Sequence, residues 1–272
     1  MEIKELEAKA LWVRQMVLEA TAASGRGHLG GTFSCTDLLV AMYYGSGMKF
    51  DPANPQWPDR DRLLTGKGHA CLALYAIFLD LGMISRERYE EYGTDGGSLG
   101  AQLDITVPGV EYNTGSLGHV LGVAAGLALA AKMDSRSCRA YALMGDAELY
   151  EGSIWEAIIF AGEHGLDKLV GIIDRNRLSV TDVLDDEGLF KNFGAKMRAF
   201  DWDYYEIDGH SFPEILDVVQ EIRKAKRPVM INANTIKGKG VSFMEHGIKW
   251  HHNVPNGAEL ELARKELSLR ST

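Results

Sequence analysis

The sequence has few cysteines, no block of positive charge and no long apolar segment, and each absence argues against a class of protein. Its 272 residues include three cysteines, Cys35, Cys71 and Cys138, an odd number at no spacing typical of a metal site. They indicate buried thiols in a reducing compartment, not a disulfide framework. The formal net charge is −9 without any basic run, so we do not expect a nucleic-acid or anionic-membrane surface.

The N-terminus also lacks the charged-then-apolar pattern of a signal peptide. The longest apolar stretch, residues 120–131, is too short to cross a bilayer. We therefore expect a cytoplasmic protein with no membrane segment. Hydrophobic residues make up 46% of the chain and charged residues 25%, which is typical of a globular protein and argues against disorder. No break or internal repeat divides the chain, so residues 1–272 are predicted to form one α/β domain.

Short apolar strands alternate with helices in the second half of the chain. The predicted strands are residues 140–144, 169–173, 204–207 and 228–233. Helices are predicted over about 6–24, 34–44, 69–81, 115–133, 153–163 and 213–226, with long loops at 50–58 and 93–115. This alternation is typical of a doubly wound, mainly parallel sheet flanked by helices.

Polar residues follow all four predicted strands, at 146, 174–176, 208–210 and 235–240. In open parallel sheets, ligands bind outside the carboxyl ends of the strands. The sequence therefore predicts a binding site at this edge.

Gly145-Asp146-Ala147-Glu148, followed thirty positions later by Asn176, has the form of a site for a metal bound to a diphosphate. Mg²⁺ prefers oxygen ligands, and diphosphate oxygens can complete its octahedron. The alternative makes Asp146 a helix cap and Asn176 a turn residue. Because both residues follow predicted strands, the metal-binding interpretation is favoured over the structural one.

Residues 144–157, MGDAELYEGSIWEA, resemble the thiamine-diphosphate motif Gly-Asp-Gly-Glu, which is followed about thirty residues later by Asn. The chain as a whole resembles transketolases, in particular the N-terminal half that occurs as a separate subunit in split transketolases. The matching stretches run in family order over nearly the whole chain: 24–31, 67–70, 114–118, 145–157, 174–178, 208–210, 237–244 and 250–251.

The resemblance implies thiamine diphosphate and Mg²⁺ as cofactors. It implies that Asp146, Asn176 and the Leu178 carbonyl hold the metal. The implied cofactor-binding residues are His69 and the backbone of Gly145 and Ala147 at the diphosphate, Gly115, Ser116 and Leu117 at the aminopyrimidine, and His251.

His28, His251 and Gln102 are the catalytic or donor-binding residues that the resemblance implies. Imidazoles exchange protons near neutral pH, which suits hydroxyl deprotonation on a donor sugar and protonation of an acceptor aldehyde. A structural role is expected for four further histidines: His119, His164, His210 and His252.

Three departures from the family pattern stand out. Ala147 replaces the second glycine of the motif, and Gln102 stands where a donor-binding histidine is expected. An amide bonds a sugar hydroxyl but does not titrate. Gln102 therefore argues against the ordinary pentose phosphates as substrates. Arg175 and Arg177 replace smaller or neutral residues; solvated surface is the preferred interpretation, with a substrate anion or a partner chain as the alternative.

Transketolases take a catalytic glutamate from a second, pyrimidine-binding domain, for which residues 1–272 leave no room. We therefore expect a separate C-terminal subunit, in a heterotetramer of two of each. The implied reaction moves a two-carbon glycolaldehyde unit from a ketose, such as a sugar phosphate, to an aldose. A branched, deoxy or sulfonated ketose is an alternative substrate, and a non-catalytic regulatory subunit is an alternative function. A pyruvate-decarboxylating relative is disfavoured by the three histidines at 28, 69 and 251.

Overall fold

The computed structural model contains one parallel sheet. It describes residues 1–45, 47–180, 182–184 and 186–269, and across these the sheet has five strands in the order β1-β2-β3-β5-β4. The strands are β1 (Arg62–Thr65), β2 (Ala140–Gly145), β3 (Leu169–Arg175), β4 (Asp203–Asp208) and β5 (Val229–Asn234). Each pairs with its neighbours in parallel, which confirms the predicted sheet.

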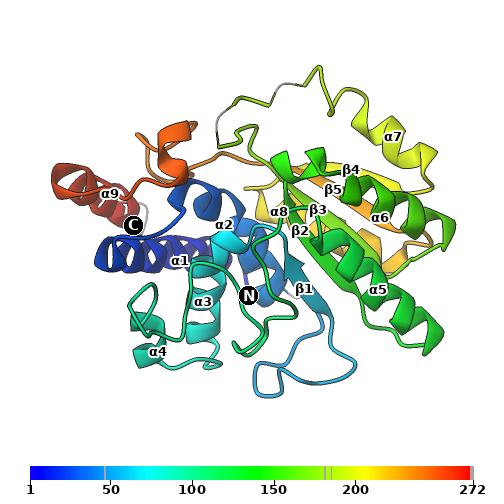
Figure 1. Cartoon of the computed structure of the whole chain (residues 1–272), viewed down its shortest axis with the longest axis horizontal. Coiled ribbons are helices and arrows are strands. Elements are labelled where there is room, and N and C mark those ends of the chain that lie inside the picture. The colour runs from blue at the N-terminus through cyan, green and yellow to red at the C-terminus, as the bar shows by residue number, and fades with distance from the viewer. Residues whose placement is uncertain (46, 181, 185, 270–272) are drawn as a thin grey trace.

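Helices cover both faces of this sheet, so β2, β3 and β5 are almost entirely buried, while the edge strand β4 is partly exposed (Figure 1). One face packs against α1 (Ile3–Ser24), α2 (Leu29–Tyr44), α3 (Cys71–Asp80) and α8 (Phe212–Glu221). The other packs against α5 (Val120–Met133), α6 (Gly152–Glu163) and α7 (Phe193–Ala199). In β2, Tyr141 and Leu143 point to the first face while Ala142 and Met144 point to the second. The arrangement is the doubly wound one.

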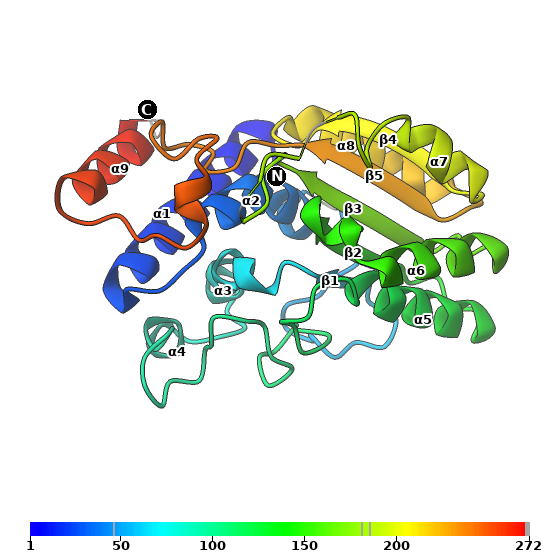
Figure 2. The same ribbon diagram turned by 45° about the horizontal axis from the view of Figure 1, so that its top comes forward.

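The remaining short elements lie around this core. They are α4 (Arg86–Glu90), α9 (Gly257–Leu269) and the 3-10 turns η1 (Gly68–Ala70), η2 (Ala147–Tyr150), η3 (Ile222–Lys224) and η4 (Ile248–His251). Helix α9 lies beside α1, away from the sheet (Figure 2), and buries Ala263 and Leu267. Within the described ranges, no helix combines the length and apolar character needed to cross a membrane.

The sequence predicted most of these elements but misplaced or missed several. Helix α2 begins at Leu29, five residues earlier than expected, because the His28 carbonyl already accepts the Thr32 N–H at 3.0 Å. Strand β1 was missed, as were α4, α7 and α9. β1 has only four residues and α4 only five, which is too short for a clear periodic signal.

A buried network ties the turns after β4 and β5 to the helical layer. Arg14 of α1 donates to both carboxylate oxygens of Asp37 at 2.9 and 2.7 Å. The Ile236 N–H donates to Nε2 of His210 at 2.8 Å, so the proton of the neutral ring sits on Nδ1, which lies 2.6 Å from the Asp37 carboxylate. These contacts match the structural role expected for His210.

Candidate functional site

The carboxyl ends of the strands meet around one buried ion pair. Lys67 follows β1, and its side chain runs across Gly145 at the end of β2 to the carboxylate of Asp174 in β3. The Lys67 ammonium also donates to the Gly31 carbonyl at 2.6 Å and to Ser34 Oγ at 3.3 Å, both in α2. The pair therefore joins the start of α2 to three neighbouring strands.

Asp174 is fully buried, and donors from several elements surround its carboxylate. Besides Lys67, it accepts from Ser34 Oγ at 2.6 Å, from Asn176 Nδ2 at 3.3 Å and from the Thr235 hydroxyl after β5. Burial alone would raise the pKa of Asp174, but the Lys67 ammonium and these hydrogen bonds hold that pKa below its usual value. The Asp174 carboxylate is charged, and its contacts hold together the carboxyl-terminal edge of the sheet.

A cavity of about 260 Å³ opens above this pair. Its walls come from loops after the strands, from the turn before α2 and from η4. The lining residues that the sequence predicted are His28, His69, Gln102, Gly115, Leu117, Gly145, Asp146, Ala147, Asn176, Leu178 and His251. Ser116 is exposed and lies outside this lining.

The three residues whose oxygen atoms were predicted to bind the metal lie on one wall of the cavity: Asp146, Asn176 and Leu178, the last through its carbonyl. Asp146 follows β2, and its carboxylate accepts the Ala147 N–H at 2.8 Å and the Arg177 N–H at 2.5 Å. Asn176 Oδ1 accepts the Leu178 N–H at 3.1 Å. Burial, with the negative charge of Asp174, raises the pKa of Asp146 to about 6. A carboxylate destabilised in this way is well suited to a hard cation, and this donor set matches the ligands that Mg²⁺ prefers.

Lys237, which follows β5, places an ammonium against the same wall. Its Nζ donates to the carbonyls of Leu178 at 3.2 Å and Ser179 at 3.0 Å. Burial, with the nearby Lys67 charge, lowers the pKa of Lys237 to about 8. Lys237 thus brings a positive charge to this wall, whereas the charge of Lys67 is paired with Asp174.

Histidines form another part of the cavity lining. The His69 ring centroid lies 5.1 Å from that of His28 and 5.3 Å from that of His251. Burial lowers the pKa of His28 to about 4, with a contribution from His252, and lowers that of His251 to about 3, with a contribution from Lys237. Burial, with the Lys67 charge, also lowers the pKa of His69. These rings are neutral near pH 7.

Two nitrogen atoms in this group are buried and unused. Nδ1 of His28 and Nδ1 of His251 have no hydrogen-bond partner among the residues that the structure describes. Buried polar atoms without partners are uncommon and indicate a missing ligand or water. The two rings are therefore available for contacts with a ligand in the cavity.

Gln102 reaches the cavity through the loop after α4. Its Oε1 accepts from Thr114 Oγ1 at 3.2 Å. A Cβ at Gly68 would lie 2.2 Å from Gln102 Oε1 and 2.0 Å from Thr114 Oγ1, so glycine is what lets this pair approach η1. Thr114 orients the amide so that its NH₂ group is left for other contacts.

Glu148 is a lining residue to which the sequence analysis gave no role. Its buried carboxylate accepts the Gly118 N–H at 3.0 Å and the Gly145 N–H at 3.2 Å. It thereby joins the loop before α5 to the end of β2. Burial raises the pKa of Glu148 to about 7.

Two expectations about individual residues were wrong. His252 was expected to be structural, but its ring lines the cavity beside His28 and His251. Arg175 was interpreted as solvated surface, yet it is buried, pairs with Asp186 at 2.7 Å and lies over the Phe190 ring. Arg177 is partly exposed and donates to Asn234 Oδ1 at 2.9 Å.

The sequence reasoning gave no role to other lining residues, Lys67, Lys237 and Glu148 among them. Each lies in a stretch that was singled out, and Lys237 and Glu148 are four positions beyond the end of a predicted strand. Two lysines within the family motifs of a chain with a net charge of −9 could have indicated an anion-binding role. By contrast, His164 packs on Phe160 with ring centroids 4.0 Å apart, and His119 is exposed outside the cavity lining.

A doubly wound sheet whose strand ends carry oxygen donors, two lysines and neutral histidines defines a domain of the class that binds a diphosphate-containing cofactor. Comparison with known proteins makes this specific. Residues 6–271 match the family described as transketolase, thiamine diphosphate binding domain. The chain belongs to the transketolase family, and the resemblance seen in its motifs is confirmed.

Its relatives include separate transketolase subunits. The chain is 40% identical over 271 residues to an apulose-4-phosphate transketolase subunit of Phocaeicola vulgatus, covering 99% of this chain and 96% of that one. It is 38% identical over 268 residues to a 6-deoxy-6-sulfo-D-fructose transketolase subunit of a Clostridium species, covering 96% and 97% of the two chains. The chain is thus a thiamine-diphosphate-binding, N-terminal subunit of the transketolase type.

A solved structure gives the same fold. The transketolase of Campylobacter jejuni superposes with a TM-score of 0.92 at 28% identity. The match covers 98% of this chain but only 43% of that enzyme, so the chain spans less than half the length of the single-chain transketolase.

Replacing Gly66 tests how far the cavity depends on Glu148. A Cβ at Gly66 would lie 2.0 Å from Glu148 Oε1. We expect Gly66→Ala to displace this carboxylate, to leave the Gly118 and Gly145 amides unpaired, and to lower the free energy of unfolding by about 1–3 kcal/mol. Urea denaturation measures the loss, and calorimetric titration with thiamine diphosphate should show weaker binding.

Gly122→Ala is the matched control. Nothing lies within 4 Å of a Cβ at Gly122, which is inside α5. Alanine should stabilise that helix by about 0.5–1 kcal/mol. Equal stability and cofactor affinity in Gly66→Ala and the unaltered chain would contradict the role given to Glu148.

Proposed function

We propose that this chain is the diphosphate-binding half of a transketolase-type enzyme that transfers a glycolaldehyde unit from a non-standard ketose to an aldose. The observation that carries the proposal is the joint presence, in one cavity, of an oxygen-donor wall and the neutral rings of His28, His69 and His251. The donor wall suits a metal and a diphosphate, while the rings suit a hydroxylated substrate.

Asp146, Asn176 and the Leu178 carbonyl would hold Mg²⁺ on the cofactor diphosphate. The Lys237 ammonium now donates to the Leu178 carbonyl. When a metal binds that carbonyl instead, the ammonium would turn to the diphosphate. His69 and the Lys67 side of the cavity would contact the same anion, with the backbone of Gly145 and Ala147 close to it. The proposed aminopyrimidine contacts are the main chain of Gly115, Ser116 and Leu117.

Bound thiamine diphosphate supplies an electron sink for the bond broken beside the ketose carbonyl. The protein residues orient the sugar and manage protons. The neutral rings of His28 and His251 each offer one lone pair and one N–H, so they would accept a hydrogen bond from a donor hydroxyl and donate one to the acceptor oxygen, the contacts along which protons would move. His251 also lines the cavity, where we propose that it contacts the cofactor.

The site needs a second chain. We propose a separate C-terminal subunit that supplies the catalytic glutamate, in a heterotetramer of two of each, with residues 1–272 acting as one unit. Relatives of matching length that are named as transketolase subunits support this division. The three cysteines are buried and free, which supports a reducing, cytoplasmic location.

Gln102 directs the proposal towards a non-standard sugar. An amide bonds a hydroxyl without titrating, so its contact with a donor sugar would differ from that of the histidine expected at this position. The relatives named for apulose-4-phosphate and 6-deoxy-6-sulfo-D-fructose support a branched, deoxy or sulfonated ketose. A purely regulatory subunit is disfavoured because Asp146, Asn176 and His69 remain together in the cavity.

Asp146→Ala tests the metal assignment. Removing this carboxylate should abolish Mg²⁺-dependent binding of thiamine diphosphate, measured by calorimetric titration of the native complex with and without Mg²⁺. Asp134→Ala is the control because Asp134 is exposed at the end of α5. Unchanged affinity in Asp146→Ala would remove Asp146 from the metal site.

Gln102→His tests the substrate assignment. The titratable ring should change the ratio of kcat/KM for xylulose 5-phosphate to that for a branched or sulfonated ketose by about tenfold or more, since polar mismatches in a substrate site have effects of this size or larger. Cofactor affinity should change little. Gln220→His, on the exposed face of α8, is the control. A constant ratio would place Gln102 outside the donor site.

A further inference from the structure

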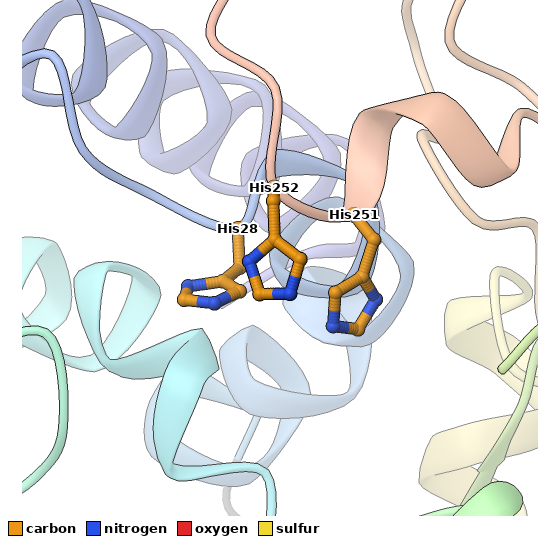
Figure 3. Close-up of side chains that lie close together, drawn as sticks. All are labelled: His28, His251 and His252. Carbon is orange, nitrogen blue, oxygen red and sulfur yellow. The ribbon is translucent and has the colours of Figure 1, made fainter. Parts of the chain in front are cut away.

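Three imidazole rings meet at one side of the cavity. His28 precedes α2, His251 ends η4 and His252 follows it. Figure 3 shows the His252 ring between those of His28 and His251. Its centroid lies 4.7 Å from that of His28 and 4.6 Å from that of His251, and the outer two are 5.6 Å apart. One ring nitrogen from each residue lies within 4.8 Å of the other two.

The chemistry of these nitrogen atoms differs from that of the oxygen wall. Nδ1 of His28 and Nδ1 of His251 are buried without a hydrogen-bond partner among the described residues. Unprotonated imidazole nitrogen is a ligand for Zn²⁺ and similar transition metals, whereas Mg²⁺ selects oxygen. The cavity therefore contains two donor sets that select different metals.

We propose that His28, His251 and His252 form a binding site for a divalent transition metal ion such as Zn²⁺, separate from the oxygen site at Asp146. Tetrahedral coordination with Zn–N distances of about 2.0–2.1 Å brings ligand nitrogens to about 3.3 Å from one another. The three nitrogen atoms now lie within 4.8 Å of one another, and rotation of the rings, of which His252 is exposed, would bring them to this spacing. The fourth coordination position stays open to the cavity.

The charges around the rings allow a dication. Lys67 is neutralised by Asp174, while Asp146 and Glu148 on the same cavity wall balance Lys237. The consequence for activity rests on the proposed function: His28 and His251 cannot bind a metal and a donor sugar at once. A transition metal in this site is therefore an inhibitor that competes with the donor.

Cobalt provides the direct test because its visible spectrum reports coordination geometry. Titrating the full chain with Co²⁺ should give one tetrahedral site per chain, displaced by Zn²⁺ and not by excess Mg²⁺. His252→Ala should weaken Co²⁺ binding about tenfold or more, the size of effect seen even for residues that only support a metal ligand. His164→Ala, at the end of α6, is the control and should bind Co²⁺ normally.

Asp146→Ala separates this proposal from the proposed function. It should keep the tetrahedral Co²⁺ spectrum while losing Mg²⁺-dependent cofactor binding. Equal Co²⁺ affinity in His252→Ala and the unaltered chain would overturn the three-histidine site. An octahedral Co²⁺ spectrum that disappears in Asp146→Ala would do the same, because it would place the metal on the oxygen wall. Retained cofactor binding in Asp146→Ala would overturn only the magnesium assignment.

Discussion

The buried ion pair between Lys67 and Asp174 is the contact on which the rest of the site depends. It joins the residue after β1 to the end of β3, crosses the glycine that ends β2, and collects hydrogen bonds from α2 and from the hydroxyl of Thr235 after β5. Removing either partner of such a pair leaves a buried charge and typically costs about 3–5 kcal/mol. The pair thus fixes where the loops above it begin, and with them the walls of the cavity.

This constraint also explains how an acidic chain can hold an anion. Because Asp174 neutralises Lys67, the ammonium of Lys237 is the charge most available to a diphosphate, and it now rests on backbone carbonyls near Asp146. Burial keeps the histidines near it neutral, so they add no positive charge and can contact a ligand only through hydrogen bonds. In the proposed site, the oxygen donors and Lys237 would serve the charged cofactor, and the neutral histidine rings would serve the hydroxyl groups of the sugar.

The sequence predicted four strands and the binding edge because apolar runs end abruptly in polar residues such as Asp146 and Asp174. It also predicted most of the cavity lining through the family motifs. It could not predict which charges pair, since Lys67 and Asp174 are 107 positions apart. Burial of Arg175 depends on a later loop carrying Asp186 and Phe190. His252 enters the cavity only because η4 turns it there, and a single histidine carries no such information.

We propose that this chain holds half of an active site and requires a second subunit. The direct measurement compares ketose turnover, with thiamine diphosphate and Mg²⁺ present, by the purified chain alone and by the complex isolated natively from its own cells. We expect no transfer by the chain alone and transfer by a complex that contains an equimolar partner. Turnover by the chain alone at the rate of the complex would contradict this proposal.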